Sequence, residues 1–177
     1  MQRIVILGNA GSGKSTMARI LGERLGLPVV HLDTLFWEPG WVEPDAEQFR
    51  NRVGEAVAGG SWICEGNYAR RTFDLRLPRA DLIIWIDTPR LICLSRVIRR
   101  NFMNRPRADL PAGCSEKINR VFMTFLKFVW SFDHGYRPGI EAVRKRTGPH
   151  VPTVHLRGRR QIAAFLESLP ATPESCL

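Results

Sequence analysis

The stretch "GNAGSGKST", Gly8 to Thr16, decides the fold of this chain. It fits the pattern G-x-x-x-x-G-K-[ST] without a gap. Glycines in such a loop let consecutive backbone N–H groups turn inward around phosphates, and the helix that follows presents its positive end to them. Lys14 would reach the β- and γ-phosphates, and the Ser15 hydroxyl would bind Mg²⁺. The sequence therefore predicts a loop that binds the phosphates of ATP with Mg²⁺, formed by Gly8, Asn9, Ala10, Gly11, Ser12, Gly13, Lys14, Ser15 and Thr16.

The sequence around this loop alternates short apolar runs with amphipathic segments. The apolar runs predict strands over residues 2–7, 29–33, 61–65, 81–87 and 153–156. Helical periodicity and capping residues predict helices over residues 14–25, 45–57, 88–104, 115–132, 140–146 and 160–169. The helix over 115–132 is apolar over a wide arc, so we expect it to be well buried. Continuous apolar strands that alternate with helices indicate an α/β fold, with a parallel sheet covered on both faces.

Length, charge and cysteine usage limit the class of protein. A chain of 177 residues is long enough for one domain, which we expect to span 1–177. The net charge of +9 favours anionic ligands. The longest apolar run, 118–132, contains Arg120 and Lys127 and is too short to span a bilayer, so we expect a cytoplasmic protein without membrane association. No CxxC pair suggests a disulfide framework or a zinc site among Cys64, Cys93, Cys114 and Cys176.

Acidic residues lie at the predicted carboxyl ends of the strands, where parallel sheets bind their ligands. Glu65 is our first choice for orienting a Mg²⁺-bound water, because Gly66 beside it leaves room for a ligand. Asp33 could accept the proton of an attacking hydroxyl group. Loop capping is the alternative role for either carboxylate. Asp87 precedes Thr88-Pro89, and we interpret it as a helix-entry residue.

The connection "DTLFWEPGWVEP", residues 33–44, is unusually rich in aromatic side chains. Phe36, Trp37 and Trp41 lie among prolines and a glycine. Such aromatics form either a minor core under the loop or a stacking wall for a flat ligand such as a base. The sequence leaves both interpretations open.

Arginines cluster between residues 90 and 107, a stretch without acidic residues. Arg96, Arg99 and Arg100 have helical spacing, so they share one face and lead into a Gly- and Pro-containing segment that fits a flap. Kinases use such arginines because the moving phosphoryl group carries spread negative charge. A solvated basic face and a nucleic-acid patch are the alternatives.

Several segments together resemble a known family. "GNAGSGKST", "LDTLFWEPGW", "WICEGNYARRTFDLRLPRADLIIWIDTPRLICLSRVIRR" and "GCSEK" are similar to the adenylate-kinase-like P-loop proteins called DNA topology modulation proteins, which are small relatives of nucleotide and shikimate kinases. The resemblance implies a three-layer P-loop kinase-like fold with a five-stranded parallel sheet of order 2-3-1-4-5. It also implies an acceptor-site region over about 33–72 and a small lid over about 100–115.

The resemblance also implies roles for individual residues. Asp33 stands where small-molecule kinases of this class keep an acceptor-site aspartate, and Glu65-Gly66 stands where they commonly have Asp-Gly. Arg70 or Arg71 lies near the place of an acceptor-phosphate arginine, shifted by a residue. The Asp-Gly-Phe-Pro-Arg signature of adenylate kinases is absent from this chain. The expected substrate-binding residues are Asp33, Trp37, Trp41, Gly66, Asn67, Tyr68, Arg70 and Arg71.

These observations predict an ATP- and Mg²⁺-dependent phosphotransferase of the nucleotide-kinase class. Its acceptor is a small molecule such as a nucleoside or nucleotide. We expect Ser15 and Glu65 to hold the metal, and Arg96 to join the nucleotide loop. The alternatives are a nucleic-acid-associated ATPase, which binds DNA weakly and without sequence preference through its basic surface, and a nucleotide-binding regulator of DNA topology. The expected catalytic residues are Lys14, Asp33, Glu65, Arg99 and Arg100.

Overall fold

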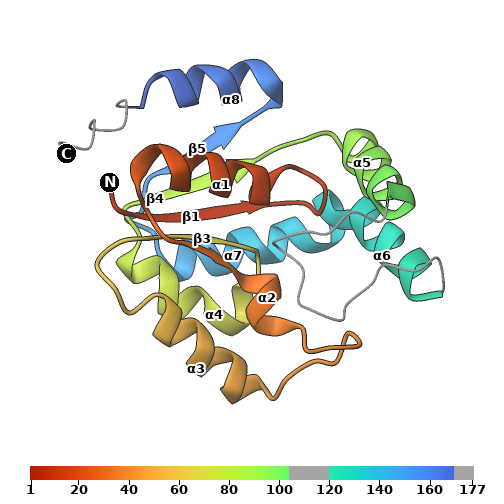
Figure 1. Cartoon of the computed structure of the whole chain (residues 1–177), viewed down its shortest axis with the longest axis horizontal. Helices are drawn as coiled ribbons and strands as arrows, with labels where there is room; N and C mark the ends of the chain where they lie inside the picture. The colour runs from red at the N-terminus through yellow and green to blue at the C-terminus, as the bar shows by residue number, and fades with distance from the viewer. Residues whose placement is uncertain (104–119, 170–177) are drawn as a thin grey trace.

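Five parallel strands form the centre of the molecule, in the order β2-β3-β1-β4-β5 (Figure 1). The computed structural model describes residues 1–103 and 120–169 of the chain. The strands are β1 Arg3–Gly8, β2 Val29–His31, β3 Trp62–Glu65, β4 Leu82–Ile86 and β5 Thr153–Leu156. Their order and direction confirm the predicted α/β fold and the strand order 2-3-1-4-5.

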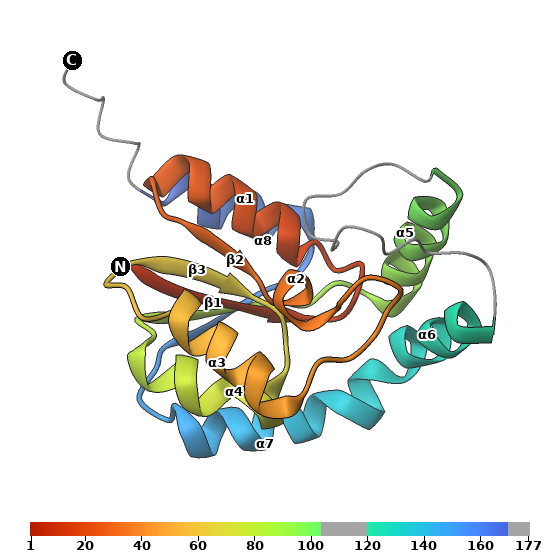
Figure 2. The ribbon, with the colours of Figure 1, turned by 60° about the horizontal axis from the view of Figure 1, so that its bottom comes forward.

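Helices cover both faces of this sheet (Figure 2). One face is covered by α1 Lys14–Leu25 and α8 Gly158–Glu167. The other face is covered by α3 Ala46–Ala56, α4 Ala69–Arg76 and α7 Arg137–Thr147. Because side chains on both faces are buried, β4 is apolar along its whole length and β1 is apolar after Arg3, as expected for strands of a parallel sheet.

Local sequence signals explain where α1 and α3 begin and end. Gly26 adopts the left-handed conformation that ends a helix, and its N–H donates to the Gly22 carbonyl. The helix therefore has the predicted bounds. Asp45 caps α3, because its carboxylate accepts hydrogen bonds from the N–H groups of Glu47 and Gln48. These two helices carry apolar stripes that pack on opposite faces of the sheet.

One predicted boundary near the carboxyl edge of the sheet was wrong, and one helix was not predicted. The second strand ends at His31 rather than at residue 33, and the chain continues as the short helix α2, Leu32–Phe36. Asp33 therefore lies in the first turn of a helix. The sequence analysis also missed α4, because only Ala69, Thr72, Phe73 and Arg76 face inward and the buried arginine hides the apolar pattern.

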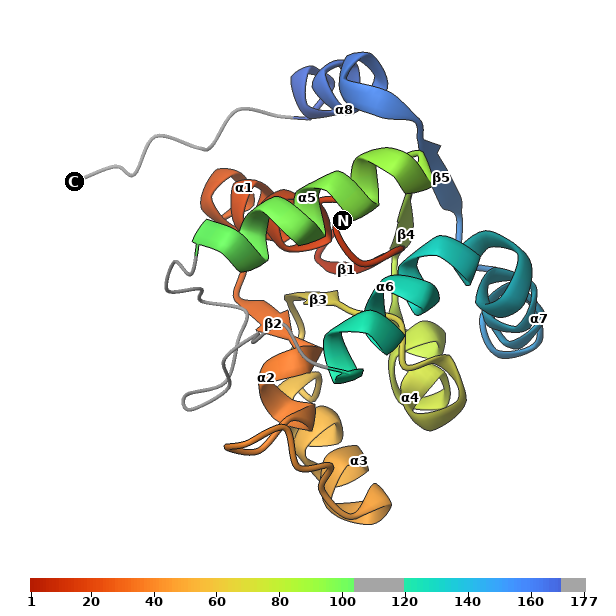
Figure 3. The ribbon, with the colours of Figure 1, turned by 90° about the vertical axis from the view of Figure 1, so that its right-hand side faces the viewer.

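Helices α5, Arg90–Met103, and α6, Arg120–Ser131, lie beyond the carboxyl ends of the strands (Figure 3). They share a small apolar cluster formed by Cys93, Val97, Phe122 and Val129. A π-helical turn, Phe132–Tyr136, connects α6 to α7, and a 3-10 turn, Leu77–Arg79, follows α4.

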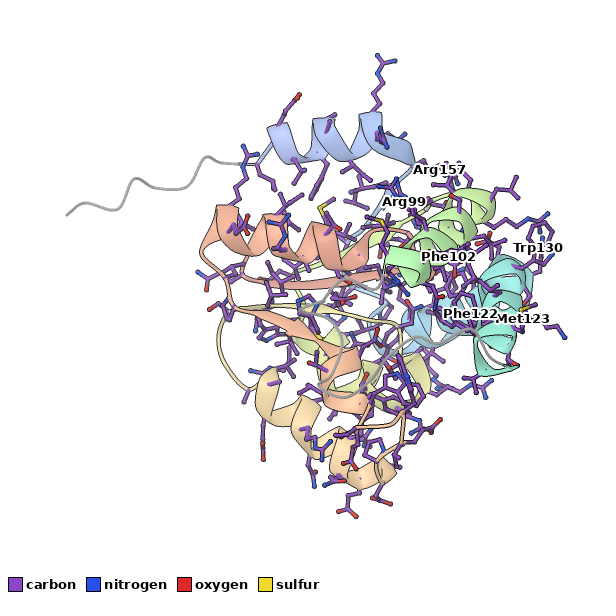
Figure 4. The ribbon with its side chains drawn as sticks, turned by 45° about the vertical axis from the view of Figure 1, so that its right-hand side comes forward. Arg99, Phe102, Phe122, Met123, Trp130 and Arg157 are labelled. Atoms are coloured by element: carbon purple, nitrogen blue, oxygen red, sulfur yellow. The ribbon has the colours of Figure 1, made fainter. Side chains whose placement is uncertain are left out.

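Helix α6 is not the well-buried helix that its composition predicts. Val121 is 69% exposed, Met123 54% and Trp130 46%, and Figure 4 shows Met123 and Trp130 on the outer side of the helix. The helix contacts the rest of the described chain mainly through Phe122, Phe128 and Val129, so only one side of its apolar arc is covered.

The predicted lid, about 100–115, lies outside the described residues except for the last turn of α5. The segment "GCSEK" lies outside them as well. Within residues 1–103 and 120–169, no helix combines the length and the hydropathy that crossing a membrane requires.

Candidate functional site

The phosphate loop connects β1 to α1 at the carboxyl edge of the sheet. The loop closes on itself, because the Ser12 N–H donates to the Asn9 carbonyl at 3.2 Å and the Lys14 Nζ donates to the same carbonyl at 3.0 Å. The first N–H groups of α1 have no carbonyl partner within the helix, so they are available to an anion. This arrangement can hold the phosphate chain of a nucleotide.

Gly11, like Gly8, is a loop position without space for a side chain. Its φ of +76° lies in the left-handed region, and a Cβ there would lie 2.5 Å from the Cys93 carbonyl oxygen and 3.0 Å from a Val97 methyl group. The loop therefore packs directly against the backbone of α5. A larger residue at this position would displace either the loop or the helix.

Two side chains from outside the loop and one of its own hold it in place. Arg96 donates from NH1 to the Gly11 and Ser12 carbonyls at 3.2 and 3.1 Å, and the Thr88 hydroxyl donates to the Ser12 carbonyl at 2.9 Å. The Asn9 amide donates to the Val129 carbonyl of α6 at 2.8 Å. Among the residues predicted to bind the nucleotide, Asn9 therefore directs its side chain to α6, while Arg96 contacts the loop.

Glu65, at the end of β3, lies directly below the first residues of α1. Its Oε1 accepts hydrogen bonds from the Ser15 hydroxyl at 3.0 Å and from Nδ1 of His31 at 2.9 Å. The side chain is 2% exposed. Burial alone would raise the pKa of Glu65, but the His31 hydrogen bond, the Lys14 charge and the Ser15 hydrogen bond outweigh it and lower the pKa. Glu65 is therefore held as a buried carboxylate beside the Ser15 hydroxyl.

This pair of oxygen groups fits a Mg²⁺ site. Mg²⁺ prefers carboxylate and hydroxyl oxygens and keeps several waters, so one hydroxyl ligand and a carboxylate that binds a coordinated water are sufficient. Ser15 and Glu65, the two residues predicted to hold the metal, are in hydrogen-bond contact. The structure thus brings together residues that are 50 positions apart in the sequence.

We expect His31→Leu to weaken the dependence on Mg²⁺, because the carboxylate loses the partner that orients it. The half-saturating Mg²⁺ concentration for nucleotide turnover should rise about 10-fold, and His31→Asn, which keeps a donor, should restore part of the loss. A Mg²⁺ titration at fixed nucleotide concentration measures this. His150→Leu, on the loop before β5 at the amino edge of the sheet, is the control. An unchanged Mg²⁺ requirement in His31→Leu would show that His31 does not orient Glu65.

The residues after Glu65 connect the phosphate loop to the acceptor side of the site. The Asn67 amide forms two hydrogen bonds with the backbone of Gly8, at 3.1 and 2.9 Å. Gly66 has φ +129°, and a Cβ on it would lie 2.9 Å from the Leu32 side chain. Leu32 therefore fills the space that a side chain on residue 66 would need.

Arg76 holds Gly66 and Asn67 in place through hydrogen bonds. It is fully buried, and its guanidinium donates to the carbonyls of Gly66 at 3.1 Å and Asn67 at 2.7 Å. Further contacts are with the Thr72 hydroxyl at 3.1 Å, the Cys64 sulfur at 3.6 Å and the face of the Phe73 ring. These partners are neutral, so the arginine does not form an ion pair with them. Its N–H groups instead donate to carbonyls that would otherwise need backbone donors.

We expect Arg76→Met to lower the free energy of unfolding by about 3 kcal/mol. The methionine would leave the buried Gly66 and Asn67 carbonyls without donors, and such losses cost about 1–3 kcal/mol each. Urea denaturation measures the change. Arg70→Met, on the exposed side of the same helix, is the matched control and should change stability by less than about 0.5 kcal/mol. Equal stability of the two variants would contradict the anchoring role.

Asp33 and Tyr68 form the second polar pair of the site. The Tyr68 hydroxyl donates to Oδ1 of Asp33 at 2.7 Å. Burial, followed by the Asp33 charge and this hydrogen bond, raises the pKa of Tyr68 far above its ordinary value. The tyrosine is therefore a stable donor to the Asp33 carboxylate. Of the residues predicted to bind the acceptor, these two are in direct contact.

The aromatic side chains of residues 33–44 are partly a minor core. Phe36 is buried, and its ring contacts the rings of Trp37, Phe49 and Tyr68 at centroid distances of 4.8, 4.9 and 4.8 Å. Trp37 and Trp41 are only half-buried and meet edge to face at 5.4 Å. The inner ring therefore supports the loop, while the two tryptophans form its outer layer.

The predicted arginines occupy different places. Arg71 pairs with Glu43 at 3.2 Å and lies over the Phe36 ring, while Arg70 is exposed. Arg99 is exposed on α5, and Arg100 is half-buried near the end of that helix. Arg96, one turn before Arg100 on α5, contacts the phosphate loop through the Gly11 and Ser12 carbonyls.

A hollow of about 410 Å³ lies between α5 and α8, beside the phosphate loop. Figure 4 labels Arg99 on α5 and Arg157 at the start of α8, the two elements that face each other across it. Arg96 connects the hollow to the loop, because it lines the hollow and also bonds to the loop carbonyls. The lining includes Thr88, Arg96 and Arg99 on one side and Gly158, Arg159 and Ile162 on the other.

Several residues of the site were missed from the sequence. His31 and Arg76 carried no motif, since an isolated histidine on a strand and an arginine in an unrecognised helix look unremarkable in sequence. Asp87 was interpreted as a helix-entry residue, but its carboxylate accepts hydrogen bonds from Arg137 at 2.9 Å and Arg157 at 3.2 Å. It therefore ties α7 and the loop before α8 to the end of β4.

The sequence of this chain is similar to those of two kinds of known protein. A Shikimate kinase from Symbiobacterium thermophilum is 32% identical over 128 residues, which cover 61% of this chain and 70% of that protein. Threonine synthase-like 1 from Homo sapiens is 29% identical over 110 residues, which cover 54% of this chain, and the match spans 15% of that protein. No protein-family model matches the chain.

Solved structures show the same fold. A shikimate kinase from Acinetobacter baumannii in complex with shikimate has a TM-score of 0.55 and 16% sequence identity, over 94% of this chain and 89% of that chain. At this identity the similarity is one of fold.

Proposed function

Because the chain belongs to the shikimate kinase family, we propose that it is an ATP- and Mg²⁺-dependent phosphotransferase whose acceptor is a small molecule with a free hydroxyl group. The observation that carries the proposal is the contact between the Ser15 hydroxyl and the buried Glu65 carboxylate beside Lys14. A carboxylate at this position would orient a Mg²⁺-bound water, as phosphoryl transfer from ATP requires.

The donor side would use the loop, the metal pair and the hollow. The loop N–H groups and Lys14 would bind the β- and γ-phosphates, and Mg²⁺ at Ser15 would neutralise charge on these oxygens. Glu65 would orient a water bound to the metal. The hollow between α5 and α8 would take the base, with the guanidinium group of Arg96 available to stack on it.

The acceptor side would use Asp33. In the transfer, a bond forms between the acceptor oxygen and the γ-phosphorus, and the bond between that phosphorus and the β,γ-bridging oxygen of ATP breaks, which leaves ADP. The proton of the acceptor hydroxyl passes to the Asp33 carboxylate. Arg99, Arg100 and Lys14 would stabilise the charge on the transferring group, and Trp37, Trp41, Arg70 and Arg71 would surround the acceptor.

Two classes of acceptor follow from different observations. The name of the Symbiobacterium relative makes shikimate one acceptor to test. The sequence resemblance to DNA topology modulation proteins, and through them to nucleotide kinases, makes nucleosides and nucleotides the other. We propose a hydroxyl acceptor of one of these two classes, without AMP as the preferred member because the Asp-Gly-Phe-Pro-Arg signature is absent.

ADP formation measured with a panel of acceptors tests the proposal. We expect ADP release to be slow with ATP and Mg²⁺ alone and to rise at least about 100-fold with one acceptor class. A matched reaction with double-stranded DNA tests the alternative of a nucleic-acid-associated ATPase. ADP release that ignores every small molecule but is stimulated by DNA, and that falls steeply with salt, would contradict the proposal and support that alternative.

A further inference from the structure

We propose that Tyr68 is a positioning residue that sets the orientation of the Asp33 carboxylate from a backbone conformation fixed by the phosphate loop. The inference deepens the proposed function and rests on it, because Asp33 is the proposed proton acceptor. Tyr68 does not need to contact the substrate. It acts through Asp33.

The backbone of Tyr68 is held in a conformation that tyrosine rarely adopts. Its φ and ψ are +35° and +39°, in the left-handed region. A non-glycine residue there is destabilised by about 1–2 kcal/mol, and such strain persists only where the surrounding structure enforces it. A glycine or asparagine would fit this position more easily, so the side chain itself accounts for the presence of a tyrosine.

The structure enforces this conformation from the preceding residue. Asn67 is bonded through its amide to the Gly8 backbone and through its carbonyl to Arg76. Thr72 adds a further contact, because its hydroxyl donates to the Tyr68 carbonyl at 3.1 Å. Both sides of the Tyr68 peptide are therefore fixed, one of them by the first glycine of the phosphate loop.

Ring packing then directs the hydroxyl. The Tyr68 ring packs against Phe36 at 4.8 Å and Phe49 at 5.1 Å. Phe36 belongs to α2, the same short helix as Asp33, and Phe49 belongs to α3. Because the ring is packed on two sides, the direction of its hydroxyl group is fixed. The hydroxyl points to Oδ1 of Asp33, to which it donates a hydrogen bond at 2.7 Å.

This hydrogen bond has a consequence for the geometry of proton transfer. With Oδ1 held, rotation of the Asp33 carboxylate is restricted, so the direction in which its other oxygen points is set as well. Because the raised pKa keeps Tyr68 protonated, it remains a donor at any pH at which the enzyme works. The acceptor aspartate is thus aligned relative to Gly8, where the donor phosphates bind.

Tyr68→Phe tests the proposal, because it keeps the ring and removes only the hydroxyl. We expect kcat to fall about 10- to 100-fold, with the KM for the nucleotide unchanged within about 2-fold, since a misplaced reacting group costs rate rather than nucleotide binding. Tyr136→Phe is the matched control, because Tyr136 is the chain's other tyrosine and is 48% exposed. It should keep the wild-type kcat.

A double-mutant cycle distinguishes positioning from a general structural role. In the Asp33→Asn background, the further change Tyr68→Phe should reduce kcat by less than about 2-fold, because the group that it positions is already inactive. If the loss of kcat in the double variant equals the product of the losses in the two single variants, the proposal is overturned. A Tyr68→Phe enzyme with wild-type kcat would overturn it too.

A structural readout separates this proposal from the proposed function. In protein labelled at the tyrosine ring Cζ carbon, Asp33→Asn should shift the Tyr68 resonance at pH 7 and leave that of Tyr136 unchanged. This measurement needs no turnover. If the wild-type protein phosphorylates no acceptor, the proposed function fails, and the resonance still decides whether the pair forms. An unshifted Tyr68 resonance would overturn the pair itself.

Discussion

Lys14→Ala is expected to reduce acceptor phosphorylation about 1,000-fold. Lys14 is the first side chain of α1, and its Nζ turns back over the loop to the Asn9 carbonyl at 3.0 Å. In that position it would contact the β- and γ-phosphates while charge develops on the transferring group. Removal of one fixed donor to such charge costs about 100- to 1,000-fold in kcat, and loss of a full positive charge belongs at the upper end.

Steady-state kinetics with and without acceptor measure this effect. Arg19→Ala is the matched control, because Arg19 is a cation on the same helix that pairs with Glu23 at 2.8 Å and is 61% exposed. It should retain wild-type kcat. A Lys14→Ala enzyme within about 3-fold of wild type would mean that the loop does not handle the transferring phosphoryl group.

Glu65→Gln is expected to reduce kcat about 100-fold and to raise the half-saturating Mg²⁺ concentration 10-fold or more, since outer ligands of a metal site affect affinity by about 10- to 100-fold. The glutamine keeps the size of the side chain and loses the charge. Nucleotide binding in EDTA should be unchanged, because the metal-free nucleotide does not use the carboxylate.

The lowered pKa of Glu65 makes the stability of the wild-type protein depend on pH. The Glu65→Gln variant lacks this contribution. A carboxylate whose folded pKa lies below the unfolded value of about 4.3 adds stability above that pH and loses it as the pH falls through the folded pKa. The stability of wild type should therefore decline relative to Glu65→Gln only below about pH 4.3. Chemical denaturation between pH 7 and pH 3 measures it.

Glu23 is an exposed carboxylate on α1, so Glu23→Gln is the control for the turnover and the stability measurements. If Glu65→Gln binds Mg²⁺ and turns over like wild type, Glu65 is a structural partner of His31 and not part of a metal site.

The fold could be predicted from the sequence because its signals are local. The phosphate-loop pattern, Gly26 after α1 and Asp45 before α3 each specify a boundary through backbone chemistry, and the structure has these boundaries. The boundary after β2 failed because Leu32 is as apolar as the strand before it, while the helix that it begins is stabilised by the packing of Phe36 on Phe49 and Tyr68.

The site could be predicted only in part, because many of its contacts join residues that are far apart in the sequence. Motif residues such as Lys14 and Ser15 are recognisable from spacing, and Glu65 from its place at a strand end. The partners that position them come from remote parts of the chain. His31 reaches Glu65 from another strand, and Arg76 reaches Asn67 from a helix whose apolar pattern it interrupts. No local pattern encodes such contacts.

The fate of the γ-phosphoryl group of ATP distinguishes transfer to an acceptor from hydrolysis. The protein is incubated with γ-³²P-labelled ATP, Mg²⁺ and the acceptor that best stimulates ADP release, and the products are separated. We predict that the label appears in a phosphomonoester of the acceptor in equal amount to ADP, and that this product is lost in Asp33→Asn. Label found only in free phosphate, with the acceptor unmodified, would contradict the account.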